Sequence, residues 1–316
     1  MPSVKKSVRG KREDTVNEIT SALECLTPEQ LEAYRRDGYL VLEGRIAPDV
    51  IAACHAELER LRQSARTLTA HTDEIDLEDS HTPDDPRIRR VKLPHKQAKV
   101  FDDLMRSDAI LAPVRDLIGP NLRLQNSKLN MKSARYGAPV DWHQDWAFYP
   151  YTNDDILAVG VFLDDVGPEN GPLMVFPGSH KGPAYDHHSG GYFAGTMSLA
   201  AAGLDPKNAV RAMAPAGSIS IHHVRIVHGS DLNRSERDRA VLFYEIAAAD
   251  AYPIQGSMGM FSSLAEFDAR MLCGQSTIEP RVRDVPVRIP QPQPPTQGSI
   301  YEIQKQSAVR GFARAM

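Results

Sequence analysis

The sequence predicts a mainly β domain of the sandwich or barrel type, with helices on its N-terminal side. Short runs of β-forming residues, separated by Gly, Pro, Asn and Asp, follow one another from residue 121 to about residue 250. The preceding part, residues 26–120, carries helix signals instead. A chain of 316 residues, 41% of them hydrophobic, can bury one large core, so no second catalytic domain is needed.

The helices are predicted from their first and last residues. Thr27 is followed by Pro and, three residues on, by Gln30, which together form a capping box. Further helices are predicted over residues 48–65, beginning at a Pro, and over 107–118, ending at Gly-Pro. Residues 66–95 are rich in Thr, Asp, Glu, His and Pro without a period, so we expect a long mobile loop there.

The strands are predicted from short apolar or alternating runs between turn residues. They cover residues 121–132, 140–148, 156–163, 172–176, 217–228 and 239–247. The second half of the first strand divides its faces unusually, with Leu129 and Met131 on one side and four polar residues on the other. The polar residues are Asn126, Lys128, Asn130 and Lys132. Ordinarily such a face is the solvent side of a sheet.

The two ends of the chain differ from the domain between them. Residues 1–25 hold a basic cluster, for which we expect a solvated, disordered arm; a nuclear signal or a contact with an anionic surface are the alternatives. Residues 286–316 begin with a Pro-rich run that suits an extended tail. One domain over 26–285 remains, with a helical part to 120 and a β core over 121–250.

Charge and cysteine content exclude several classes of protein. The net charge of −4 gives no reason to expect a nucleic-acid partner. The chain has no apolar run of membrane-spanning length and no signal-peptide pattern, so we expect a cytoplasmic protein without membrane contact. Three cysteines without metal-type spacing argue against a disulfide scaffold or a zinc ribbon.

A His-x-Asp pair with a distant His carries the chemistry. His143 and Asp145 fall on one side of a predicted strand, and His228 follows 83 residues after Asp145 at the end of another. Two His and one carboxylate can fill one face of Fe(II) and leave the other open. Arg239, eleven residues after His228, offers two parallel donors to a carboxylate. Taken singly, such a His is more often an ordinary surface group or a hydrogen-bonded core residue than a metal ligand.

Several ordered motifs resemble one family. They are Trp-His-Gln-Asp at 142–145, the segment 170–180, and His228-Gly-Ser followed by Asn233 and Arg239. Residues 26–30 and 37–44 are similar to the first helix and strand of the same family. Together, over residues 26 to about 250, they resemble the phytanoyl-CoA dioxygenase family of Fe(II)/2-oxoglutarate oxygenases.

The resemblance implies a fold, a ligand set and a reaction. The core is expected to be a double-stranded β-helix, the cupin-like jelly roll. His143, Asp145 and His228 are implied as iron ligands, and Arg239, Ser230 and Asn130 as contacts of 2-oxoglutarate. Arg234 and Arg237 compete for the role of Arg239, which has the spacing of the family. Dioxygen is the cosubstrate and ascorbate the expected reductant.

The expected reaction is hydroxylation of a small polar or anionic metabolite or natural-product intermediate, with release of succinate and CO2. Because a carboxylate is present at Asp145, hydroxylation is favoured over halogenation. Asn126, Lys128 and Trp146 are expected to contact the substrate, although packing explains Trp146 equally well. Loops 66–95 and 183–205 are expected to close over the pocket. The protein is expected to be a monomer or homodimer.

Other outcomes stay open from the sequence. The same cofactors support desaturation, epoxidation or cyclisation. A cupin metalloprotein without 2-oxoglutarate chemistry, such as an isomerase, would have no use for Arg239 and Ser230, and a non-catalytic binding module would not need an intact metal-ligand set. His222 and His223 precede the distal motif, and we expect packing or supporting roles for them rather than metal binding.

Overall fold

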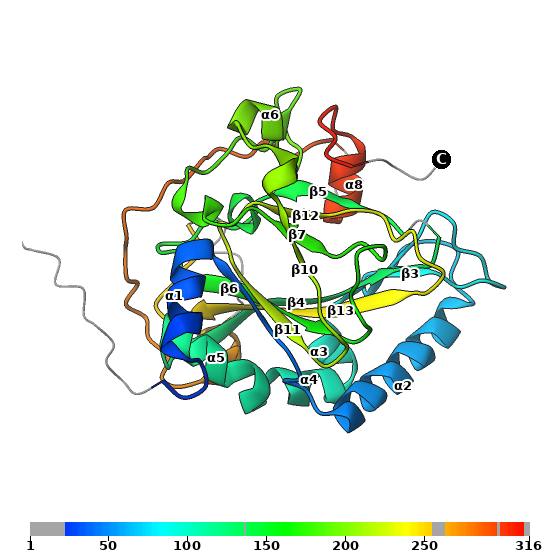
Figure 1. The fold of residues 1–316 in the computed structure, drawn as a ribbon, viewed down its shortest axis with the longest axis horizontal. Helices are drawn as coiled ribbons and strands as arrows, with labels where there is room; N and C mark the ends of the chain where they lie inside the picture. The colour runs from blue at the N-terminus through cyan, green and yellow to red at the C-terminus, as the bar shows by residue number, and fades with distance from the viewer. Residues whose placement is uncertain (1–22, 136, 255–262, 296–297, 313–316) are drawn as a thin grey trace, which may run out of the picture.

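The computed structural model describes residues 23–135, 137–254, 263–295 and 298–312. Within these residues two antiparallel sheets face each other, and most of the helices lie beneath the larger one (Figure 1). Residues 1–22, most of the predicted basic arm, lie outside the described residues. No helix in the described part of the chain is long and apolar enough to cross a membrane.

The larger sheet has the strand order β1-β11-β6-β13-β4-β3-β2, and β14 pairs with β4 at one end. Its strands are β1 (Tyr39–Leu42), β2 (Ile75–Leu77), β3 (Ile88–Lys92), β4 (Leu122–Lys132), β6 (Ile156–Phe162), β11 (Ile219–His223), β13 (Arg239–Ala248) and β14 (Met271–Cys273). The smaller sheet has the order β10-β7-β12-β5. Its strands are β5 (Val140–His143), β7 (Leu173–Val175), β10 (Val210–Ala212) and β12 (His228–Ser230). A separate hairpin joins β8 (His188–Ser189) to β9 (Tyr192–Phe193).

The α-helices are α1 (Pro28–Asp37), α2 (Pro48–Ala65), α3 (Pro94–Gln97), α4 (Lys99–Met105), α5 (Asp108–Ile118), α6 (Leu199–Ala202), α7 (Leu264–Asp268) and α8 (Ile300–Lys305). The predicted capping box is present, because the Thr27 hydroxyl accepts from Gln30 N at 3.2 Å and the Gln30 side chain accepts from Thr27 N at 2.9 Å. Gly38, at φ 81°, ends α1 in the left-handed region that favours glycine.

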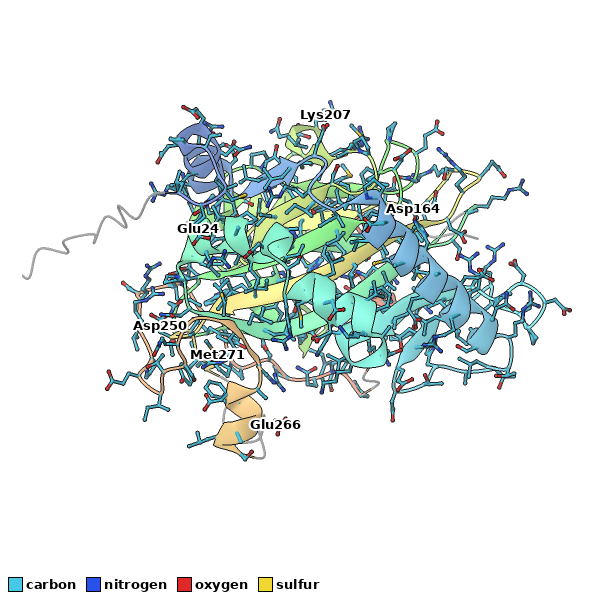
Figure 2. The ribbon with its side chains drawn as sticks, turned by 90° about the horizontal axis from the view of Figure 1, so that it is seen from below. Glu24, Asp164, Lys207, Asp250, Glu266 and Met271 are labelled. Atoms are coloured by element: carbon cyan, nitrogen blue, oxygen red, sulfur yellow. The ribbon has the colours of Figure 1, made fainter. Side chains whose placement is uncertain are left out.

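The main core lies between the helices and the outer face of the larger sheet. Figure 2, seen from below, shows the blue and teal helices lying across the strands. Leu129 and Met131 of β4 pack into this core, together with side chains of α2, α4 and α5. The opposite face of β4, including Lys128 and Asn130, lines a cavity between the two sheets. The polar face of this strand is therefore not its solvent side.

Three predictions from the sequence are wrong in detail. Residues 66–95 are not one long loop, because they contain β2, β3 and the start of α3. β3 was not predicted because Arg90 and Lys92 interrupt its apolar pattern. Arg90 lines the cavity instead of facing solvent. Residues 140–148 are not one strand either, since β5 ends at His143 and a 3-10 turn covers Asp145–Ala147.

The third error concerns residues 217–228, which form two strands in different sheets. β11 ends at His223 in the larger sheet and β12 begins at His228 in the smaller one. The buried residues 224–227 cross between the sheets. The strand predicted over residues 217–228 is therefore interrupted between His223 and His228. The strands predicted over 121–132, 156–163, 172–176 and 239–247 are confirmed within a few residues.

The C-terminal segment packs across the domain. Residues 286–295 run in extended form, with Pro292 O accepting from Phe193 N at 2.7 Å. The helix α8 then lies beside β5 (Figure 1). The Gln304 side chain, fully buried, accepts from Asp141 N at 2.9 Å and donates to Gly195 O at 2.7 Å. These contacts hold β5 two residues before His143.

Candidate active site

The two histidines are brought together by strand pairing. β5 and β12 are antiparallel neighbours, and His143 and His228 are direct partners in their register. Residues opposite one another in an antiparallel pair point to the same face of a sheet. Their rings accordingly lie with centroids 4.1 Å apart, on the face that looks toward the larger sheet.

Asp145 reaches the same point by a turn. After His143 the chain takes one extended residue, Gln144, and enters the 3-10 turn at Asp145. Gln144 fixes this bend, because its N–H donates to His187 Nε2 at 2.9 Å and its amide donates to Arg225 O at 2.8 Å. Convergence of the His-x-Asp pair therefore comes from a bend held on both sides, not from regular strand alternation.

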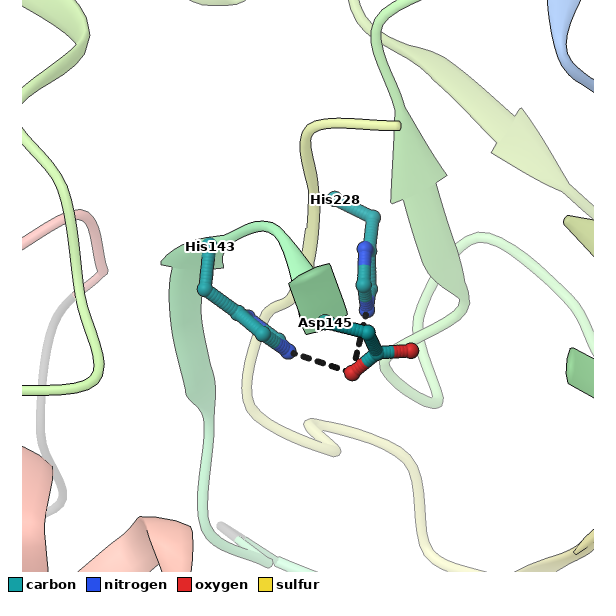
Figure 3. A group of neighbouring side chains, drawn as sticks. All are labelled: His143, Asp145 and His228. Atoms are coloured by element: carbon teal, nitrogen blue, oxygen red, sulfur yellow. Dashed lines mark ion pairs between the residues drawn. The ribbon is translucent and has the colours of Figure 1, made fainter. Parts of the chain in front are cut away.

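The three side chains form a compact, buried group, which we call the metal triad: His143, Asp145 and His228. Their ligand atoms all lie within 4.8 Å of one another. Asp145 Oδ1 is 3.6 Å from His143 Nε2 and 3.9 Å from His228 Nε2 (Figure 3). One divalent ion fits among these atoms after small movements, with two imidazole nitrogens and one carboxylate oxygen on a single side.

Backbone contacts set the tautomers of both rings. His143 Nδ1 lies 2.8 Å from Asp141 O, and His228 Nδ1 lies 3.0 Å from Ile226 O. A carbonyl oxygen only accepts, so both Nδ1 atoms carry the proton and both Nε2 lone pairs face the centre of the triad. This arrangement, in which the second nitrogen donates to a carbonyl, is the usual one for metal-bound histidine.

The electrostatics favour the protonation states that bind metal. Burial alone would raise the pKa of Asp145, but electrostatic interactions with Lys128 and His228 hold it well below its usual value. Burial, together with the nearby His143, lowers the pKa of His228 well below its usual value. An anionic carboxylate and neutral imidazoles are the forms that coordinate a metal ion.

Arg239 lies at another part of the same cavity and is 4% exposed. Its guanidinium donates to the carbonyl oxygens of Asn170, at 3.3 Å, and Gly171. Burial lowers its pKa to about 10, so it stays charged at neutral pH. Among the residues that the structure describes, no carboxylate lies within ion-pair distance of it. A buried cation that faces a cavity in this way is suited to an anionic ligand.

The other proposed contacts of 2-oxoglutarate share this cavity. Ser230, at the end of β12, and Asn130, on β4, both line it. The Asn130 Oδ1 atom is buried and has no hydrogen-bond partner among the described residues. Of the competing arginines, Arg237 is exposed and Arg234 forms an ion pair with Asp231 at 2.5 Å. Neither lines the cavity, which favours Arg239.

The expected substrate contacts are only partly in place. Lys128 lines the cavity, with its Nζ 2.6 Å from Oε1 of Glu245, a carboxylate only 1% exposed. Asn126 is not among the lining residues and pairs with Glu245 further along the sheet. Trp146 does not line this cavity either; it packs in a separate core cluster, and its indole N–H donates to Pro286 O at 2.8 Å.

Two polar lining residues, Arg90 and Tyr301, were not singled out from the sequence, and His222, for which only a packing or supporting role was expected, lines the cavity as well. Arg90 lies in β3, within the region expected to be a loop, and Tyr301 lies in α8, within the expected tail. His222 carried a usable signal, because it alternates with Ser220 on the inner face of β11.

Comparison with known proteins identifies the family. The family model described as phytanoyl-CoA dioxygenase matches residues 34–241. The chain is 36% identical over 281 residues to a probable alpha-ketoglutarate-dependent hypophosphite dioxygenase of Stutzerimonas stutzeri, covering 88% of this chain and 96% of that protein. It is 29% identical to L-proline trans-4-hydroxylase of Streptomyces griseoviridis, covering 70% of this chain and 88% of that protein.

Solved structures agree with these relatives. The structure of EctD from S. alaskensis with bound Fe superposes with a TM-score of 0.62 and 26% identity, covering 72% of this chain and 79% of that chain. EctD with 2-oxoglutarate and 5-hydroxyectoine gives a TM-score of 0.60 at 27% identity, over 71% and 77% of the two chains. The jelly-roll fold and the cofactors expected from the sequence, Fe(II) and 2-oxoglutarate, are confirmed. This chain belongs to the phytanoyl-CoA dioxygenase family and is a 2-oxoglutarate-dependent non-haem iron dioxygenase.

Proposed function

We propose that this enzyme hydroxylates a small anionic substrate. The metal triad holds Fe(II), and the cosubstrate 2-oxoglutarate is held by Arg239, Ser230 and Asn130. Iron and 2-oxoglutarate supply the oxidising chemistry, while the protein contributes binding, orientation and exclusion of water. Dioxygen is reduced by four electrons, two from conversion of 2-oxoglutarate to succinate and CO2 and two from conversion of a substrate X–H bond to X–OH.

The charge of the cavity lining supports an anionic substrate. Four cationic side chains line the cavity, and the one carboxylate among its lining residues is Asp145 of the metal triad. The cations are Arg90, Lys128, Lys132 and Arg239. Lys128 is paired with Glu245, and Lys132 donates to the carbonyl oxygens of Ala138 and Asp231. With Arg239 assigned to 2-oxoglutarate, Arg90 and Lys132 still give this part of the lining a positive charge. A buried cation needs an anion or strong acceptors nearby.

The volume of the cavity supports a small substrate. About 60 Å³ of it is open to the centres of water molecules, and one water needs roughly 10–15 Å³ of such space. Much of this room goes to 2-oxoglutarate. The hypophosphite dioxygenase relative is named for a small monoanion, whereas L-proline trans-4-hydroxylase and ectoine dioxygenase are named for zwitterions. The cationic lining favours the monoanion.

The test is succinate formation by the purified protein with Fe(II), ascorbate and 2-oxoglutarate. Hypophosphite, L-proline and ectoine are added separately, and Asp145→Ala serves as the control for non-enzymatic turnover. We expect hypophosphite to stimulate succinate formation and to be converted to phosphite in equal amount. Stimulation by the zwitterions alone would show that the preference for an anion is wrong. Ascorbate as reductant, a cytoplasmic location and a monomeric or homodimeric state remain predictions from the sequence.

A further inference from the structure

His222 is buried beside the metal triad without a hydrogen-bond partner. It lies on the inner face of β11, is 2% exposed and lines the cavity. Neither of its ring nitrogens has a hydrogen-bond partner within the described part of the chain. Buried polar atoms in folded proteins are nearly always paired, so an unpaired ring at this place requires a functional explanation.

A nearby carboxylate oxygen accounts for the position of the ring. His222 Nε2 is 3.5 Å from Asp145 Oδ2, just beyond a good hydrogen bond. The other carboxylate oxygen, Oδ1, is the one that approaches His143 and His228. The two oxygens of Asp145 are thus divided, one toward the triad histidines and one toward His222.

His222 is not a fourth metal ligand in this geometry. The group of ligand atoms within 4.8 Å of one another contains only the metal triad, among the residues described. The His222 ring lies beside His228, with centroids 4.7 Å apart, and meets the edge of Phe243 at 6.2 Å. These two rings hold it against the carboxylate.

We propose that His222 is a positioning residue for Asp145, whose Oδ2 accepts a hydrogen bond from His222 Nε2–H. This contact keeps Oδ2 away from the metal, so that Asp145 binds through Oδ1 alone. The proposal rests on the assignment of iron to the metal triad. A carboxylate bound through both oxygens would take one of the three positions left open by the triad, two of which 2-oxoglutarate needs.

The test compares replacements of His222 that keep or remove the donor. His222→Leu removes the donor. His222→Gln places an amide N–H near the position of the histidine Nε2, where it can donate to Asp145. His222→Asn places its amide N–H near the position of Nδ1, which is too far from Asp145. Each protein is titrated without oxygen, first with Fe(II) and then with 2-oxoglutarate, following the charge-transfer absorption of the chelate. We expect His222→Leu and His222→Asn to weaken Fe(II) binding about 10- to 100-fold and to weaken 2-oxoglutarate binding as well. His222→Gln restores both.

His180→Leu is the matched control for loss of a buried imidazole. His180 is 8% exposed, has an unpaired Nδ1, and does not line the cavity. Its replacement should leave both titrations unchanged. Equal weakening by His222→Gln and His222→Asn would overturn the proposal, as would wild-type binding by His222→Leu. Asp145→Ala in the same titration separates the two claims, because retention of Fe(II) by that variant would refute the metal site itself.

Discussion

Replacing Arg239 by Leu tests how 2-oxoglutarate is held. The substitution removes a buried cation of the cavity lining that has no carboxylate within ion-pair distance in the described structure. Two of its five N–H donors are used by the carbonyl oxygens of Asn170 and Gly171. Three donors remain, which is enough for a bidentate pair with a carboxylate.

The expected effect is large because the site is buried. Removing one partner of a buried, hydrogen-bonded charge pair costs about 2–5 kcal/mol. At about 1.4 kcal/mol per tenfold change, this corresponds to an increase of about 30- to 4,000-fold in the dissociation constant of 2-oxoglutarate. Binding of Fe(II) should change little, since Arg239 does not contact the metal triad.

The assay is calorimetric titration of 2-oxoglutarate into the Fe(II)-loaded protein without oxygen. Arg237→Leu, an exposed replacement two residues away, is the matched control and should bind like the wild type. Arg239→Lys should fall between, because it keeps the charge but loses the paired donors. If Arg237→Leu weakens binding and Arg239→Leu does not, the assignment is refuted.

Three further substitutions probe the surroundings of the site. Lys128→Met should lower the free energy of unfolding by about 3–5 kcal/mol, because it leaves buried Glu245 without its 2.6 Å partner; an unchanged urea midpoint would contradict this. Burial lowers the pKa of His187 to about 4, below the value near 6.5 of an unfolded chain. As the pH falls, His187 is protonated in the unfolded chain before it is protonated in the folded protein, so the free energy of unfolding should fall by up to about 3 kcal/mol from pH 6.5 to 4. In urea unfolding, His187→Gln should make the free energy of unfolding depend less steeply on pH. An equally steep pH dependence in the variant and the wild type would contradict this prediction. Gly160→Ala puts a Cβ 2.8 Å from the Phe243 ring and should destabilise the protein by about 1–3 kcal/mol, whereas a wild-type melting temperature would show that the ring moves freely.

The parts of the site that could be predicted were those with local signals. His143, Asp145, His228 and Arg239 stood in motifs of fixed spacing, and strand alternation placed Lys128 and Asn130 on one face. The same alternation gave the right outcome for Asp145 for the wrong reason, because a 3-10 turn directs its side chain.

The missing parts depended on contacts between distant segments. β3 was hidden because a cavity-facing strand carries charged residues where a core-facing strand carries apolar ones. Tyr301 belongs to a short helix whose position comes from packing and from Gln304 bonding to β5. The six residues of α8 are too few for a hydrophobic period to predict these contacts from the sequence. Whether the ring nitrogens of His222 find hydrogen-bond partners likewise depends on residues from other strands, so a sequence motif cannot predict it.

The central claim is that one metal ion binds where the two sheets meet. The most direct measurement is a titration of metal-free protein with Fe(II) in the presence of 2-oxoglutarate and without oxygen, comparing the wild type with His228→Ala. His223→Ala is the matched control, since His223 lies five residues earlier and its Nε2 faces Asp154 at 3.9 Å. We predict one equivalent of Fe(II) and a charge-transfer band for the wild type and for His223→Ala, and neither for His228→Ala. Full binding by His228→Ala, or its loss only in His223→Ala, would contradict the account.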